Sequence, residues 1–263
     1  MRYLKHVLPT TVLVGVCALS TAGAQAGAIS GAFAVLSWDT LAIDPGSGSL
    51  DYASPRGSVS AHALTDSDDV FSDDFILGWT DGNADAFAPN TSANAWTGDQ
   101  LGLGIDNEVA ASTDSLGEGT PNTSSVSFAS ASRWVDFTYV GSVASTVSFM
   151  LDYMIEASAT KELTSDSASA TADVGIKVRN DRSGVERSMT DEVSVEILTP
   201  AGTDHDWTSG TLTVSMLLQP GDTGRFEAFA SADSEARGTI PIPSPIALML
   251  CGFIGLGFAR LRR

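Results

Sequence analysis

The stretch Thr211-Leu-Thr-Val-Ser-Met-Leu-Leu-Gln-Pro-Gly-Asp-Thr-Gly-Arg-Phe-Glu-Ala-Phe-Ala-Ser-Ala-Asp233 decides the fold class. Apolar residues alternate with polar ones along both of its halves, which is the two-residue period of a half-buried strand. The alternating apolar residues are Leu212, Val214, Met216 and Leu218, then Phe226, Ala228, Ala230 and Ala232. Between them, Gln219–Gly224 is rich in turn residues, because Pro220 fixes φ and Gly221 permits a positive φ. The stretch predicts a β-hairpin with a longer loop, whose small inward alanines let a facing sheet approach closely.

The same period recurs through most of the chain, and no segment between residues 27 and 239 has a sustained helical period. We therefore predict an all-β fold, an antiparallel β-sandwich of jelly-roll-like type, for residues 27–239. The alternating runs are Val143 to Ile155 (with Val147, Phe149, Leu151 and Tyr153), Val135 to Tyr139, Val174 to Val178 and Val193 to Ile197; shorter strands are predicted at Gly31–Trp38, Gly57–Leu64 and Ser125–Ser132.

The pattern is weaker between Thr65 and Asn122, where Asp, Asn, Gly and Ser dominate. Only Phe75–Trp79 resembles a strand there. We expect a long loop region, of a length that is uncommon in compact domains unless it is functional or mobile.

The acidic residues make charge a strong constraint on partners. The chain has 14 Lys and Arg against 32 Asp and Glu, and five of the basic residues (Arg2, Lys5, Arg260, Arg262, Arg263) lie in the two ends. The body is left with 9 basic and 32 acidic residues, a net charge of about −23. Nucleic acid is therefore not an expected partner, because phosphate binding needs a basic patch. Cations, neutral polysaccharide and basic surfaces are plausible.

The acidic residues Asp66, Asp68, Asp69, Asp73, Asp74 and Asp81 are candidate calcium ligands, since calcium takes six to eight oxygens. Asp81-Gly-Asn-Ala-Asp85 begins like a calcium loop, but Ala86 replaces the turn glycine and Ser92 the bidentate glutamate. The competing interpretation is a solvated acidic loop. We expect no cofactor, with calcium kept as the one possible ion.

Catalytic motifs are missing from the sequence. The body has two histidines, His62 and His205, and contains neither G-x-S-x-G nor H-E-x-x-H. Both cysteines (Cys17, Cys251) lie in the apolar ends, so the body has neither a disulfide nor a thiolate nucleophile. We predict no enzymatic activity, with a secreted hydrolase as the least favoured alternative. Of the five tryptophans (Trp38, Trp79, Trp96, Trp134, Trp207), Trp79 and Trp96 are the better candidates for stacking on a sugar.

The N-terminus has the order of a secretory signal peptide: positive residues, an apolar stretch from Val7 to Leu19, then small residues. Cleavage is possible after Ala24 or Ala26, and we favour a signal peptide of residues 1–26. At the other end, residues 240–263 hold three prolines (Pro241, Pro243, Pro245), an apolar run at 246–259 and three arginines. That run is short for a membrane span, but its flanking arginines favour a membrane helix whose charges stay in the cytoplasm.

This C-terminal order resembles the PEP-CTERM sorting signal of exported proteins of Gram-negative bacteria. Ile242-Pro243-Ser244-Pro245 stands where that family has Val-Pro-Glu-Pro, with Ser244 in place of the Glu, and Arg260, Arg262 and Arg263 form the basic tail. The resemblance implies a transient anchor in the inner membrane with the body in the periplasm, and processing by an exosortase. It also implies delivery to the cell surface or matrix, and association with exopolysaccharide or biofilm.

We therefore expect an exported, non-enzymatic surface or extracellular-matrix protein. The alternative is a calcium-supported carbohydrate-binding or adhesin module.

Overall fold

The computed structural model describes residues 27–78, 80–98, 108–117, 123–197 and 201–238. The predicted signal peptide (1–26), the sorting motif Ile242, Pro243, Ser244 and Pro245, the apolar segment 246–259 and the tail arginines Arg260, Arg262 and Arg263 lie outside these residues. Among the residues that the structure describes, no helix combines the length and the apolar character needed to cross a membrane.

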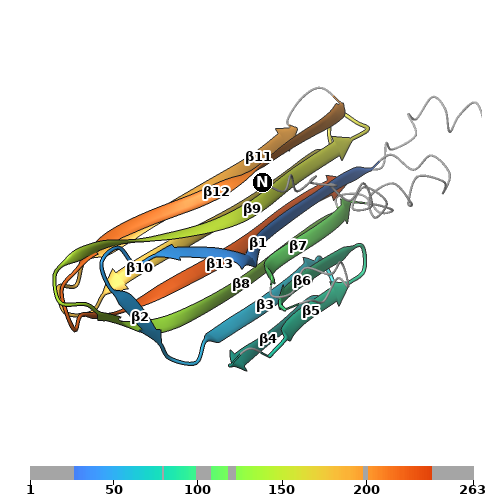
Figure 1. Ribbon diagram of the computed structural model, residues 1–263. Helices are drawn as coiled ribbons and strands as arrows, with labels where there is room; N and C mark the ends of the chain where they lie inside the picture. Colours follow the sequence, from blue (N-terminus) through green and yellow to red (C-terminus); the bar gives the residue numbers. More distant parts are fainter. Residues whose placement is uncertain (1–26, 79, 99–107, 118–122, 198–200, 239–263) are drawn as a thin grey trace, which may run out of the picture.

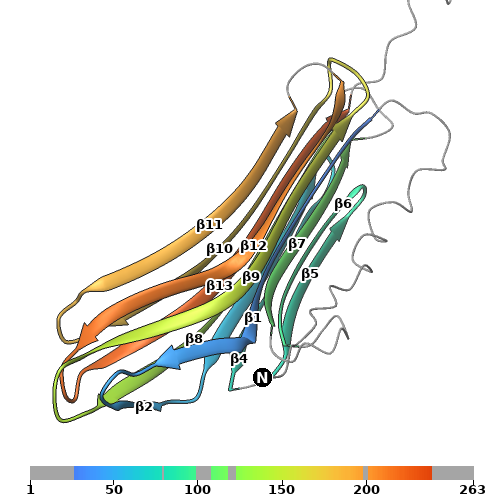
Figure 2. The same ribbon diagram turned by 45° about the horizontal axis from the view of Figure 1, so that its top comes forward.

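The described chain forms two antiparallel sheets that stack as a long, curved sandwich (Figures 1 and 2). The all-β prediction is confirmed. In order across the first sheet, sheet A, lie β12 (Gly202–Leu218), β9 (Ser145–Lys161), β1 (Ala28–Asp44), β7 (Glu108–Gly117), β6 (Thr91–Thr97) and β5 (Gly82–Ala88). Sheet B contains β11 (Glu186–Ile197), β10 (Ser167–Asn180), β13 (Thr223–Gly238), β8 (Thr123–Val140), β3 (Arg56–Thr65) and β4 (Asp69–Leu77), while β2 (Ser49–Tyr52) pairs with the end of β8.

The hairpin predicted at Thr211–Asp233 is wrong. Its two strands exist, but β12 pairs with β9 in sheet A, whereas β13 lies between β10 and β8 in sheet B. The turn residues therefore form an arch that carries the chain from one sheet to the other. Alternation shows which side chains face inward, and it is identical for two strands that pair and for two that face each other across the core.

Hydrogen bonds from three segments hold this arch in place. The Asp222 carboxylate is 3 % exposed, and its Oδ2 accepts bonds from Gln219 N (2.8 Å) and Asn180 Nδ2 (2.7 Å). Arg182 Nη1 lies 3.4 Å from Asp222 Oδ1. Tyr139 N donates to the carbonyl of Asp222, and Gly221 N donates to the carbonyl of Tyr139. The arch is thus tied to β8 and to the β10–β11 turn.

The long loop expected between Thr65 and Asn122 is also wrong, because this region contains β4, β5, β6 and β7. The inward positions of β5 and β6 are mainly alanine, and those of β7 are Val109, Ala111, Thr113, Ser115 and Gly117, so alternation in these strands carries little apolar contrast. Those buried alanines are Ala84, Ala86, Ala93, Ala95 and Ala111. The strand expected at Phe75–Trp79 corresponds to the end of β4, and Trp79 lies outside the described residues.

Most other predicted strands are confirmed inside longer ones. Gly31–Trp38 falls within β1 and Gly57–Leu64 within β3, while Ser125–Ser132 and Val135–Tyr139 both belong to the single strand β8. The predictions for 174–178 and 193–197 fall within β10 and β11. One inward residue is wrong, because Val143 precedes β9 and is exposed.

The core changes composition along the sandwich. Near the arch it is built from large side chains, and Phe149 stacks on Phe226 with ring centroids 4.8 Å apart. Near the opposite end, which includes Gly117 and Gly238, the inward residues are mostly alanine and serine. A Cβ placed on Gly117 would lie 2.4 Å from the backbone nitrogen of Gly238, so the two sheets are in direct backbone contact there.

Candidate functional site

The outer face of sheet B carries exposed aromatic rings. Phe71 and Phe75 on the edge strand β4 are 63 % and 57 % exposed, and Leu77 beside them is equally open. Alternation puts these residues on the opposite face from Ile76, which is buried in the core. Phe75 pairs with Ser58 on β3, Ser58 with Ser132 on β8, and Ser132 with Phe229 on β13. These four residues therefore form one row across the sheet.

Phe75 and Trp134 lie close to each other, with Arg225 beside them. The centroids of Phe75 and Trp134 are 5.9 Å apart, and the Arg225 guanidinium carbon lies 5.6 Å from the centroid of Trp134. Phe229 lies over Gly175 on the neighbouring strand, because a Cβ there would be 2.3 Å from the ring. Phe75, Trp134, Phe229 and Arg225 are hereafter called the aromatic platform. Such rings offer an apolar surface on which a flat ligand can stack.

Hydroxyl groups fill the rows between the rings. The Oγ atoms of Ser58 and Ser132 are 3.0 Å apart, and those of Ser60 and Ser130 are 2.9 Å apart. Each serine is only partly buried, so one hydroxyl of each pair can also bond a ligand or water. The face thus combines apolar rings with neutral donors and acceptors.

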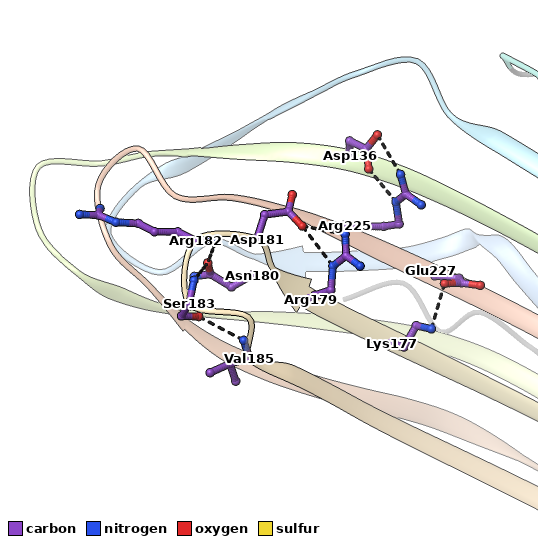
Figure 3. Close-up of polar contacts among 10 residues, drawn as sticks. All are labelled: Asp136, Lys177, Arg179, Asn180, Asp181, Arg182, Ser183, Val185, Arg225 and Glu227. Carbon is purple, nitrogen blue, oxygen red and sulfur yellow. Dashed lines mark hydrogen bonds and ion pairs between the residues drawn. The ribbon is translucent and has the colours of Figure 1, made fainter.

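Figure 3 shows ion pairs near the β10–β11 turn, one of which includes Arg225 of the platform. Arg225 Nε donates to Asp136 Oδ1 at 2.7 Å, Arg179 Nη2 lies 2.9 Å from Asp181 Oδ1, and Lys177 Nζ lies 3.3 Å from Glu227 Oε2. The hydrogen bond that Arg225 donates to Asp136 raises the pKa of Arg225, although burial acts against this. These pairs are partly solvated and are each worth at most about 1 kcal/mol, so they shape the charge of the surface more than its stability.

The two described histidines lie apart, each beside a carboxylate at the surface. His62 Nε2 is 2.7 Å from Asp69 Oδ1, and its ring meets Phe71 edge-on with centroids 6.1 Å apart. His205 Nε2 is 2.9 Å from Glu156 Oε1 on the outer face of sheet A. In both cases the contact joins neighbouring strands, which is the ordinary geometry of a cross-strand pair.

The acidic residues proposed for calcium are spread over several elements. Asp66 Oδ2 accepts a bond from Ser124 N, and Asp69 contacts His62. The stretch Asp81–Asp85 does not form a calcium loop, because Gly82–Ala88 is the strand β5, in which Ala84 and Ala86 point into the core. Within the described ranges, no three His, Cys, Asp or Glu residues are grouped so that they could hold a metal ion.

The tryptophan prediction is corrected in part. Trp96 is only 5 % exposed and its Nε1 donates to Glu108 Oε2 at 3.2 Å, so it cannot stack on a ligand. It belongs to a small second cluster on the outer face of sheet A, with Val35 and Ala110. Trp207 is 57 % exposed on the edge strand β12, and Trp134 is partly exposed in the aromatic platform.

Sequence reasoning missed the aromatic platform. A signal was available in Asp69-Val-Phe-Ser-Asp-Asp-Phe-Ile-Leu77, where Phe71, Asp73, Phe75 and Leu77 share one face. Aromatic residues on the same face as an aspartate indicate an exposed face rather than a buried one. The neighbours Trp134 and Phe229 come from strands far away in the chain, and only the register of sheet B brings them together.

A comparison of the chain with protein-family models, curated proteins and solved structures found no match.

Proposed function

We propose that this protein is an exported, non-enzymatic component of the cell surface or extracellular matrix. In this proposal a signal helix at 1–26 directs export, and the segment 240–263, with its hydrophobic helix at 246–259, holds the chain in the inner membrane. An exosortase then processes it at the motif Ile242–Pro245, and the sandwich is delivered to the surface or matrix of a Gram-negative cell.

The observation that carries this proposal is the division of charge along the chain. All 32 acidic residues lie between two acid-free, apolar ends that carry five of the 14 basic residues. Basic residues stay on the cytoplasmic side of a membrane, so both ends orient the acidic body outward. The described body supports a structural role through its long paired strands. Its histidines contact surface carboxylates on separate sheets.

The termini of the mature protein test this proposal. Mass spectrometry of membrane, surface and released fractions is expected to find an N-terminus at Gly27 and a C-terminus near Pro243. Replacing both Pro243 and Pro245 with alanine is expected to leave the full C-terminus in the membrane fraction, while Pro220→Ala is the matched control. Recovery of Arg263 in every fraction of wild-type cells would contradict sorting and indicate a permanent anchor.

The aromatic platform favours a second candidate function, a carbohydrate-binding or adhesin module. Sugar rings stack on aromatic side chains, and the serine hydroxyls beside Phe75 and Trp134 supply neutral hydrogen-bond partners. A polysaccharide would lie along this face without entering a pocket. Calcium supports this candidate only if it raises the affinity, which makes titration with the ion part of the same experiment.

Co-sedimentation with insoluble neutral polysaccharides tests the second candidate. Trp134→Ala is expected to weaken retention about tenfold, because one stacked ring contributes about 1–1.5 kcal/mol. Trp207→Ala is the matched control, since it removes an exposed tryptophan from sheet A. If the wild-type protein is retained by none of the polysaccharides, the second candidate is removed and the first stands.

A further inference from the structure

A cleft of about 390 Å³ opens between the two sheets beside the end of β1. The pairing of β1 with β7 extends only as far as Ser37. The part of β1 that follows Ser37 borders this opening. The volume falls at the small end of the range of pockets that bind small molecules. Its walls are formed by Trp38, Leu41, Ile43, Tyr52, Ala53, Ser54 and Val135.

A β-bulge shapes one wall. From Ser37 to Ala42 strand β1 advances five residues, while its partner β9 advances only from Asp152 to Met150. Thr40 fixes the bulge, because its hydroxyl donates to Ser37 O at 2.7 Å and accepts from Asp152 N at 2.9 Å. Bulges redirect side chains and occur often beside binding sites. Here the bulge carries Trp38 and Leu41, both of which line the cleft.

Contacts with neighbouring strands fix the position of the other walls of the cleft. Trp38 packs against Phe226 with ring centroids 5.7 Å apart, which fixes the indole at the floor of the cleft. On the opposite side, Ala53 N donates to Asp136 O at 2.9 Å, which ties the segment after β2 to β8. Tyr52, the residue before Ala53, also lines the cleft and is 48 % exposed. Partial burial raises the pKa of its phenol, which stays neutral at physiological pH.

The lining is mainly apolar and offers few polar partners. Leu41, Ile43 and Val135 supply aliphatic surface, and the side-chain hydroxyls are those of Tyr52 and Ser54. A sugar needs a partner for each of its many hydroxyls when it leaves water, so this lining favours an apolar ligand with a single polar group.

None of the described residues that line the cleft is charged, but the body as a whole is strongly acidic, with 9 basic and 32 acidic residues. Asp39, Asp44 and Asp51 are next to lining residues in the sequence, but their side chains are exposed and alternation turns them away from the cleft. Arg56 and Arg133 are each two residues from a lining residue, and the buried Arg133 donates to Thr80 O at 3.1 Å. Across the sheet, Arg225 is paired with Asp136. The net charge of about −23 on the body therefore favours a cation over an anion at this opening.

We propose that this cleft is a binding site for a small, mainly apolar organic cation, such as an aromatic or alkyl amine. Its ring or chain packs against Trp38, Leu41 and Ile43, and its ammonium group lies at the mouth, near the tyrosine ring. An ammonium group beside the face of Tyr52 also gains a cation–π interaction. This site lies between the sheets and is separate from the aromatic platform on the outer face of sheet B.

Three probes with the same ring and different charge test the proposal: benzylamine, benzyl alcohol and benzoate. Each is titrated into the full-length chain and followed by saturation-transfer NMR and by quenching of tryptophan fluorescence. Benzylamine is expected to bind most tightly and benzoate most weakly, with about a fivefold difference or more between them. Equal binding of benzylamine and benzoate, or saturable binding of none of the three, would overturn the proposal.

Filling the cleft locates the binding. Ala53→Trp places a bulky ring at the mouth and is expected to weaken benzylamine binding at least about fivefold. Ala144→Trp, at an exposed position in the turn before β9, is the matched control and is expected to bind as the wild type does. Ser54→Trp serves the same purpose should Ala53→Trp lose its native circular dichroism. Binding that is unchanged in a folded cleft-filling variant would overturn the assignment to this cleft.

Discussion

The two ends of the sandwich have the same strand alternation but different cores. Near the arch, inward positions hold large residues such as Phe137, Tyr139 and Phe149, whereas at the end near Gly117 they hold alanine and serine. Side-chain volume sets how far apart two packed sheets lie, about 10 Å with ordinary residues. Small residues allow a closer approach, down to the backbone contact between Gly117 and Gly238. We call these regions the aromatic end and the alanine end.

The close approach changes which interactions join the sheets. At the alanine end serine hydroxyls reach the opposite sheet, as Ser30 Oγ donates to Glu235 O at 2.8 Å and Ser125 Oγ to Leu116 O at 3.0 Å. Ser115, Ser127 and Ser234 form a buried cluster with Oγ separations of 2.8–3.1 Å. The aromatic end is stabilised mainly by apolar burial, and the alanine end also by hydrogen bonds between sheets.

The largest expected effect is at the aromatic end. Phe149→Ala removes a ring that contacts both Phe137 and Phe226, and we expect the free energy of unfolding to fall by about 3–5 kcal/mol. Ala157→Gly in the same strand is the comparison and is expected to cost about 1 kcal/mol. Urea unfolding followed by circular dichroism measures both. Similar losses in the two variants would show that the two ends do not differ in this way.

The second prediction concerns the alanine end, where the sheets leave little room for a larger side chain. Ala236→Leu, two residues before Gly238, adds volume between sheets that already lie close together, and we expect a loss of about 1–3 kcal/mol. Thermal melts of this variant and of the exposed control Ala144→Leu measure the loss. An Ala236→Leu variant as stable as the wild type would contradict close packing at this end.

The third prediction tests the arch at the aromatic end through pH. Burial raises the pKa of Asp222, but hydrogen bonds from Gln219 N, Asn180 and Arg182 outweigh it, so the pKa is lower than that of an ordinary aspartate. A lowered pKa in the folded state stabilises the protein above the unfolded pKa of about 3.9, and this stabilisation is lost as the pH falls through the folded value.

Asp222→Asn is accordingly expected to lower stability at pH 7 by about 1–3 kcal/mol, since an amide nitrogen cannot accept the bonds that the carboxylate accepts. Its stability should also depend less on pH below about pH 4 than that of the wild type. Urea unfolding at several pH values measures this dependence, with Asp181→Asn in the neighbouring turn as control. Parallel pH profiles for wild type and Asp222→Asn would contradict the role of this carboxylate.

The smallest expected effect is that of a single hydroxyl at the alanine end. Ser234→Ala removes one member of the buried serine cluster and is expected to cost about 1 kcal/mol. The exposed pair Ser148 and Ser215, with Oγ atoms 2.7 Å apart, supplies the control Ser215→Ala, which is expected to have little effect. A larger loss of stability in Ser215→Ala than in Ser234→Ala would contradict the view that burial makes these hydrogen bonds stabilising.

Local sequence predicted the strands wherever inward residues are large. Val174–Val178 and Val193–Ile197 alternate between strongly apolar and polar residues, and both lie in strands. The residues of β5 and β6 follow the same period with alanine inside, so their contrast in hydrophobicity is too small to be recognised. The burial of Trp96 was missed for another reason, because the outer face of sheet A carries its own small cluster.

By itself, the sequence determined the all-β character, the charge of the body and the inward face of most strands, because a two-residue period and a count of charges are local properties. The tertiary structure decided which strands pair. It therefore decided that Thr211–Asp233 forms an arch, that Phe75 meets Trp134, and that a bulge in β1 opens a cleft beside Tyr52. Pairing depends on contacts between residues far apart in the chain, and alternation is the same whichever strand becomes the neighbour.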